Sequence, residues 1–276
     1  MILMSIEKRR IAIRSKDKHE TSFIIERKDD PQSGESLSKT YRSQVSAVGL
    51  VFHGDRIAHK RNLVLKRYED YPVSLENRAI GIENRRDRAI TLYNILKSIG
   101  VKHIPATFRA VGEQEILMTD FNKGGHVTLS RNIPKSGEPR EEQIESLTNF
   151  NEAIKELGKD FFIAALHNIY IIPDALFLVV PDRGAKVNCR IEIADLEEMA
   201  SLNNGHFTPR RLVDAKTVEL QYRRSVESLK DFFSRHIISH RVFLSDSACR
   251  KLGDLAKGIL LPDNLAEDIR RRLNTT

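Results

Sequence analysis

The chain has 276 residues, of which 40% are hydrophobic, and it carries a formal net charge of +7. A chain of this length can bury a sizeable core in one or two domains. Its two cysteines, Cys189 and Cys249, form no Cys-x-x-Cys or Cys/His spacing, which argues against a zinc site or a disulfide framework. The start MILMSI is too short for a signal peptide, and Pro173 and Asp174 interrupt the longest apolar stretch. We therefore expect a cytoplasmic protein with no membrane partner.

The first half of the chain is typical of a small antiparallel sheet covered by one helix. The polar segment Lys28 to Thr40 is rich in turn formers and is expected to be an exposed loop. Helical spacing of apolar residues predicts the helix, which Gly100 is placed to end. The helical positions are Ala89, Leu92, Tyr93, Leu96 and Ile99, and the strand candidates are Thr21 to Glu26, Ser46 to Phe52, Asn62 to Tyr68, Ala106 to Val111 and Glu115 to Phe121.

The second half is predicted to be mainly helical, with one hairpin. The runs Ala175 to Val180 and Cys189 to Ala194 flank the turn formers Pro181 to Gly184, which indicates a hairpin. An apolar stripe over Ile144, Leu147, Ile154 and Leu157 predicts a helix closed by Gly158, and Thr208-Pro209 is expected to start a helix carrying Val218, Tyr222, Leu229 and Phe233. Two shorter helices are expected, one from Ser245 and one with Leu265, Ile269 and Leu273 on a single face.

An acidic triplet, Asp195-Leu196-Glu197, follows this hairpin. In the protein-kinase-like superfamily a similar hairpin ends in the Asp of Asp-Phe-Gly, which binds the magnesium of a nucleotide. Upstream, NLVLKRY (62 to 68) resembles the third strand of that fold, and ILMTDFNKGG (116 to 125) resembles its fifth strand and hinge. The chain thus resembles a divergent member of this superfamily over residues 45 to 200. The resemblance implies an α+β, bilobal protein-kinase-like fold, with a β-rich lobe at 1–121 and a shortened, mainly helical lobe at 122–276.

The resemblance also implies a site for ATP and Mg²⁺. Lys66 falls where the family's third strand carries the lysine that holds phosphate, and Asp195 falls on the metal-binding Asp. Met118 or Thr119 lies near the gatekeeper position, with Asp120 and Phe121 at the hinge. The acid that pairs with the lysine is expected on the helix after the third strand, where Ala89 occupies the position and Glu83 and Asp87 are the nearby acids.

The chain departs from the family in its catalytic loop, which runs His-Arg-Asp with an Asn five residues after the Asp. If His167 is that His, Ile169 occupies the catalytic position; if Pro173 is matched to the proline of that loop, Tyr170 occupies it and Ala175 takes the Asn position. Neither register supplies a base, and His167 and Tyr170 remain the catalytic candidates. Asp174 would take the metal role of the Asn if the loop has gained or lost one residue. The glycine-rich loop is also reduced, to Gly49 and Gly54.

Three functions follow from these observations. The first is a regulatory or binding pseudokinase with an unknown protein or small-molecule partner. The alternative is an active atypical phosphotransferase acting on a protein or a small molecule, since loss of a base alone removes about 10²–10⁴-fold of rate. The third is a basic, nucleic-acid-associated module, because Arg-rich pairs such as Arg210-Arg211 and Arg223-Arg224 recur along the chain. These pairs are interleaved with acids, as on the solvated faces of a basic protein.

Overall fold

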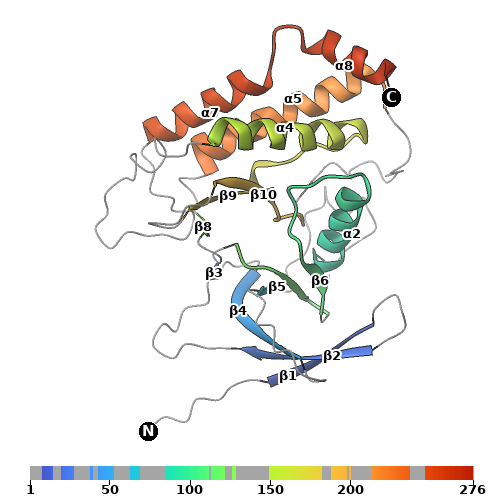
Figure 1. The fold of residues 1–276 in the computed structure, drawn as a ribbon, viewed down its shortest axis with the longest axis vertical. Coiled ribbons are helices and arrows are strands. Elements are labelled where there is room, and N and C mark those ends of the chain that lie inside the picture. The colour runs from blue at the N-terminus through green and yellow to red at the C-terminus, as the bar shows by residue number, and fades with distance from the viewer. Residues whose placement is uncertain are drawn as a thin grey trace. The chain divides into compact units, whose positions relative to one another are not determined.

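The structure, a computed structural model, contains runs of antiparallel strands and several helices and is therefore of the mixed α+β class (Figure 1). The α+β prediction is confirmed at this level. The structure describes residues 8–14, 20–27, 38–39, 43–52, 63–68, 85–111, 113–121, 126–128, 149–181, 188–197, 199, 213–236 and 246–275.

The chain divides into two compact units. The first comprises residues 1–73, 83–90 and 105–120, and the second comprises residues 74–82, 91–104 and 121–276. The sequence-based division was a single cut after residue 121, whereas the chain passes between the units several times. The last passage falls between Asp120 and Phe121.

The first unit contains a seven-stranded antiparallel sheet. Its order is β1-β2-β4-β5-β7-β6, with β3 paired to β4 outside this path. Strand β5 lies between β4 and β7, and its residues Leu63, Val64 and Tyr68 are buried. The strands are β1 (Lys8–Arg14), β2 (Glu20–Arg27), β3 (Ser38–Lys39), β4 (Ser43–Phe52), β5 (Leu63–Tyr68), β6 (Phe108–Ala110) and β7 (Glu115–Thr119).

The five strands expected in the first half are all present, as β2, β4, β5, β6 and β7. Two further strands were missed. Strand β1 pairs with β2 along its whole length, and Ser38–Lys39 pairs with Val45 and Gln44 inside a segment expected to be a loop. Backbone pairing with β4 stabilises this short strand, although its own polar sequence does not predict one. Residues 28–37 and Thr40 of that segment lie outside the described residues.

Helix α2 (Arg85–Ser98) confirms the helix predicted in the first half. Ala89, Leu92, Tyr93 and Leu96 are buried along one face. Gly100 has a φ of +93°, a left-handed conformation that ends the helix and that a side chain would strain. Residues 85–90 of α2 belong to the first unit and residues 91–98 to the second.

The second unit is built on helices that pack against one another. Helices α4 (Phe150–Leu166), α5 (Ala215–Asp231) and α7 (Asp246–Leu260) lie side by side, and α8 (Leu265–Asn274) packs on α5 (Figure 1). Each buries an apolar stripe at helical spacing; in α5 it includes Val218, Tyr222 and Leu229, as predicted. A π-helical turn, Phe232–His236, follows α5 and places the predicted Phe233 in the core. The two short C-terminal helices are confirmed as α7 and α8.

The predicted hairpin is also confirmed. Strand β9 (Leu176–Pro181) pairs antiparallel with β10 (Arg190–Ile193), and β8 (His126–Thr128) pairs with the other edge of β9. In β10 the buried Ile191 and Ile193 alternate with Arg190 and Glu192, whose side chains form an ion pair 2.7 Å long. The hairpin thus has one apolar face towards the core. Its turn residues 182–187 lie outside the described residues.

Two predicted helix ends are wrong. Gly158 does not close α4, which continues to Leu166. The glycine instead lies inside the helix, where the absence of a side chain allows close packing with α7. Helix α5 takes Asp214 as its N-cap, with its first residue at Ala215 rather than at the expected Thr208-Pro209. Thr208 and Pro209 themselves, like Ile144 and Leu147 of the predicted stripe, lie outside the described residues.

Candidate functional site

The base of the hairpin joins the backbones of Ala175 and Ala194, the residues next to Asp174 and Asp195. Leu176 is paired with Ile193 in the sheet, and one step further the amide of Ala194 donates to the carbonyl of Ala175 over 2.8 Å. Asp174 precedes Ala175 and Asp195 follows Ala194, and both acids are half-buried. Asp174 lies in the short 3-10 helix Pro173–Ala175, directly before β9. The predicted metal-binding acids therefore come from adjacent ends of one hairpin.

The segment before this hairpin is held against α5. The amide of Ile171 donates to Ser225 Oγ over 2.9 Å, and Gln221 Nε2 donates to Asn168 Oδ1 over 2.8 Å. Asn168 has a φ of +59°, which suits an asparagine better than most side chains. Ser225 Oγ donates in turn to the carbonyl of Gln221 over 3.1 Å. The contacts from Ser225 and Gln221 thus attach the segment to α5 at Asn168 and Ile171.

The two catalytic candidates and Ile169, which occupies the base position in one register, lie in three different environments. Ile169 is fully buried, so in the register that begins with His167 the base position is part of the core. The ring of Tyr170 lies 4.8 Å from the guanidinium carbon of Arg224, a cation–π contact. His167 is the C-cap of α4, and its backbone amide donates to the carbonyl of Ala164.

Asp174 falls on the metal-binding Asn position of the family's loop in one of the two registers, contrary to our expectation. Counted from His167, Asp174 stands five residues after Ile169 and so falls on the Asn position without any change in loop length. The change of one residue in loop length that we expected to be necessary is therefore not required in this register. It is needed only in the register matched on Pro173, which puts Ala175, a fully buried residue, at the metal-binding position.

In the first unit, Lys66 is a buried lysine on the central strand β5. It pairs with Ile116 of β7, only 6% of it is exposed, and its Nζ lies 4.9 Å from the centroid of the Tyr68 ring. Lysines are almost never this buried unless they have partners. Lys66 belongs to the first unit and Asp195 to the second, and their pairing across one nucleotide stays a prediction.

The other expected nucleotide-site residues differ in burial. Met118 is buried on β7, and Asp120, directly after β7, is 5% exposed. Phe121 is buried and its ring centroid lies 5.8 Å from that of Phe177 on β9. Asp87, in the first turn of α2, pairs with the adjacent Arg86, whereas Glu83 lies outside the described residues. Of the two acids considered as partners for Lys66, the structure thus describes one.

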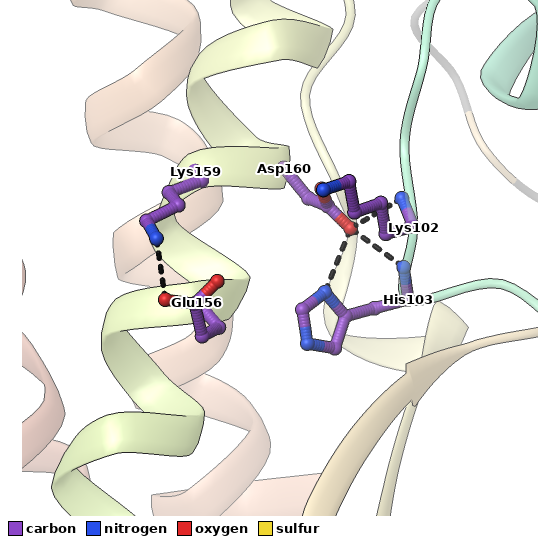
Figure 2. A network of polar contacts seen from close by, with 5 residues as sticks. All are labelled: Lys102, His103, Glu156, Lys159 and Asp160. Carbon is purple, nitrogen blue, oxygen red and sulfur yellow. Dashed lines mark hydrogen bonds and ion pairs between the residues drawn. The ribbon is translucent and has the colours of Figure 1, made fainter.

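One polar cluster was missed from the sequence. Figure 2 shows that the carboxylate of Asp160, on α4, accepts hydrogen bonds from the backbone amides of Lys102 and His103 and from the His103 ring. Asp160 continues the helical spacing of the apolar residues Phe150, Ala153 and Leu157. An acid at a position that this spacing buries was the feature of the sequence that could have indicated the cluster. The residues that bind it lie more than fifty positions away and carry no such signal.

The described residues set limits on other chemistry. Within them, no three His, Cys, Asp or Glu side chains gather closely enough to hold a metal ion by themselves. Two carboxylates suit Mg²⁺ bound with a nucleotide, because that ion commonly takes one or two carboxylates together with phosphate oxygens and water. Burial raises the pKa of the Cys189 thiol to about 11, so it remains protonated at neutral pH and is a poor nucleophile.

Comparisons with known proteins give no relative: no protein-family model matches the chain, and a search of curated proteins finds no match. Among the helices in the described ranges, none has the length and apolar character needed to cross a bilayer. The function is therefore argued from the residues themselves.

Proposed function

We propose that this chain is a bilobal protein-kinase-like protein that has lost its catalytic base and acts as a regulatory or binding pseudokinase that binds ATP with Mg²⁺. One observation carries the proposal. A backbone hydrogen bond joins Ala175 and Ala194, the residues next to Asp174 and Asp195, while Ile169, at the base position in the register that begins with His167, is buried in the core. This supports a site that keeps two acids able to bind a metal ion but has no base.

The roles in this site follow the charges of its residues. Asp174 and Asp195 would hold Mg²⁺, which neutralises phosphate charge when bound. The ammonium of Lys66 would bind phosphate oxygens, and Met118, Asp120 and Phe121 would lie near the base of the nucleotide. A general base typically supplies about 10²–10⁴-fold of rate, so its loss leaves binding intact and transfer slow.

A thermal-shift titration with ATP, with and without Mg²⁺, tests this function. A ligand at one hundred times its Kd stabilises a protein by about 2.7 kcal/mol, which such a titration resolves. We expect Mg²⁺ to increase the shift in the wild type. Asp195→Asn removes a ligand charge and should abolish the metal-dependent part, whereas Lys66→Met should abolish most of the shift with ATP.

Matched controls separate these effects from general damage. Asp263→Asn and Lys251→Met make the same chemical changes at exposed positions of the second unit and should leave both shifts unchanged. A wild type with no shift, or an Asp195→Asn variant with an intact metal-dependent shift, would contradict the proposal. Phosphate transfer at about 1–100 s⁻¹, typical of kinases, would instead favour the active phosphotransferase.

A further inference from the structure

Asp160 lies on the buried face of α4 and is only 2% exposed. Its Oδ2 accepts three hydrogen bonds: from the Lys102 amide at 2.8 Å, from the His103 amide at 2.6 Å and from His103 Nδ1 at 2.8 Å. Two backbone amides already donate to this oxygen, so the contact with the ring is a third hydrogen bond in the tautomer that carries its proton on His103 Nδ1. A buried acid with three donors fixes both the backbone and the ring of the segment that it binds.

The same segment holds the strand that leads to Asp195. The carbonyl of His103 accepts a hydrogen bond from the amide of Ile193, at the end of β10, over 2.7 Å. Ala194, the next residue, donates to Ala175 at the start of the hairpin, and Asp195 follows. Direct hydrogen bonds therefore run from Asp160 through His103 to a backbone position two residues before Asp195.

Figure 2 also draws two charged side chains from the same helix as Asp160. Glu156 and Lys159, also on α4, form an ion pair with each other, and both are largely exposed. The pKa of the Glu156 carboxyl is lowered mainly by its hydrogen bond from Lys159. Figure 2 draws no hydrogen bond from Glu156 or Lys159 to the backbone of Lys102 or His103. Glu156 is therefore a matched acid on the same helix, one turn away.

We propose that Asp160 is a positioning residue for the metal site: it holds residues 102–103, and these hold β10 so that Asp195 faces the metal. The inference rests on the proposed function. Asp160 does not contact the nucleotide or the ion. It acts through the backbone, in the way that outer-shell partners orient metal ligands, whose loss typically costs about 10–100-fold in metal affinity.

The test compares Asp160→Ala, Asp160→Asn and Glu156→Ala by amide hydrogen exchange and by ATP titration at several Mg²⁺ concentrations. For Asp160→Ala we expect faster exchange at Ile193 and His103, a Mg²⁺ affinity about 10–100-fold weaker, and metal-free ATP binding close to that of the wild type. Asp160→Asn keeps an acceptor oxygen of similar shape and should restore part of both losses. Glu156→Ala should behave as the wild type.

Asp160→Asn also keeps the test usable if Asp160→Ala fails to fold. In that variant the ¹⁵N signals of the His103 ring should change, because its Nδ1 proton loses a charged partner. An Asp160→Asn variant with unchanged Ile193 exchange and unchanged Mg²⁺ affinity overturns the inference while the proposed function stands. A wild type that binds no Mg²⁺ with ATP overturns the proposed function first, and the positioning role falls with it.

Discussion

Asp214 illustrates how one side chain sets a helix boundary. Its Oδ1 accepts from the amides of Lys216 and Thr217, at 3.0 and 3.1 Å, and its Oδ2 accepts from the Thr217 hydroxyl at 2.7 Å. These contacts hold the pKa of the Asp214 carboxyl below its usual value, and the hydrogen bond from the Thr217 hydroxyl contributes most. As the N-cap, Asp214 accepts hydrogen bonds from two of the amides that begin the helix and have no partner within it. The first buried residue of α5, Val218, follows four positions later.

Replacing Asp214 should make the protein less stable in a pH-dependent way. Since the folded pKa is lowered, the carboxylate stabilises the protein fully above its unfolded pKa of about 3.9 and loses this effect as the pH falls through the folded pKa. We expect Asp214→Ala to lower the unfolding midpoint modestly at pH 7. The difference from wild type should shrink as the pH falls below about 4. Urea unfolding at pH 3 to 7 measures both effects.

Two variants complete this prediction. Asp214→Asn keeps an acceptor for the helix amides, so it should recover most of the stability at pH 7 and lack the carboxylate's pH dependence. Asp263→Ala removes an exposed acid elsewhere in the second unit and should change little. Equal midpoints for wild type and Asp214→Ala at pH 7 would count against this capping role.

The contact between α4 and α7 depends on Gly158. A Cβ built at this position would lie 2.5 Å from Leu260 Cδ2. The end of α7 is held in place, because the Tyr222 hydroxyl donates to the Leu260 carbonyl over 3.1 Å. Burial raises the pKa of Tyr222 to about 12, so this phenol stays a donor throughout the neutral range. Leu260 is itself buried, which leaves its side chain little room to move.

Gly158→Ala should therefore destabilise the protein despite the better helix propensity of alanine. Overpacking typically costs about 1–3 kcal/mol, and alanine gains about 1 kcal/mol over glycine within a helix, so we expect a net loss of about 1 kcal/mol. The free energy of unfolding in urea measures this.

Gly258, in the exposed part of α7, provides the control. A Cβ there meets no atom within 4 Å, so Gly258→Ala should stabilise the protein by about 0.4–1 kcal/mol. Opposite signs for the two substitutions identify packing as the cause. A stabilising Gly158→Ala would show that Leu260 moves aside easily.

At the scale of the whole molecule, the net charge of +7 comes from basic residues mixed with acids. In the described residues several arginines pair with a nearby acid: Arg190 with Glu192, Arg223 with Glu219, and Arg271 with Asp268. Such pairing reduces the field that a phosphate backbone would meet. We therefore predict weak contact with nucleic acids rather than a dedicated interface.

We expect binding to a labelled 20-nucleotide single strand to be non-specific, with a Kd of roughly 10⁻⁴–10⁻⁶ M at physiological salt and a further steep loss at higher salt. Fluorescence polarisation across a salt series, with scrambled sequences as the control, measures this. A Kd near 10⁻⁸ M, roughly that of specific complexes, with a preference for one sequence, would favour the nucleic-acid-associated alternative.

The sequence by itself determined the local elements of this protein. The spacing of apolar residues located α2, α5 and α8, and Gly100 marked the end of α2. Alternating runs and turn formers located the hairpin and five strands of the sheet. These features were predictable because helix and strand periods are set by residues a few positions apart.

Tertiary structure alone decided which residues meet. It placed Leu260 against Gly158, joined Ala194 to Ala175 beside the two predicted metal acids, and surrounded Asp160 with donors from residues 102–103. It also put Ile169 in the core, where its apolar side chain is stabilised by burial. Such partners lie far apart along the chain, and their meeting depends on how the elements pack, which no local pattern encodes.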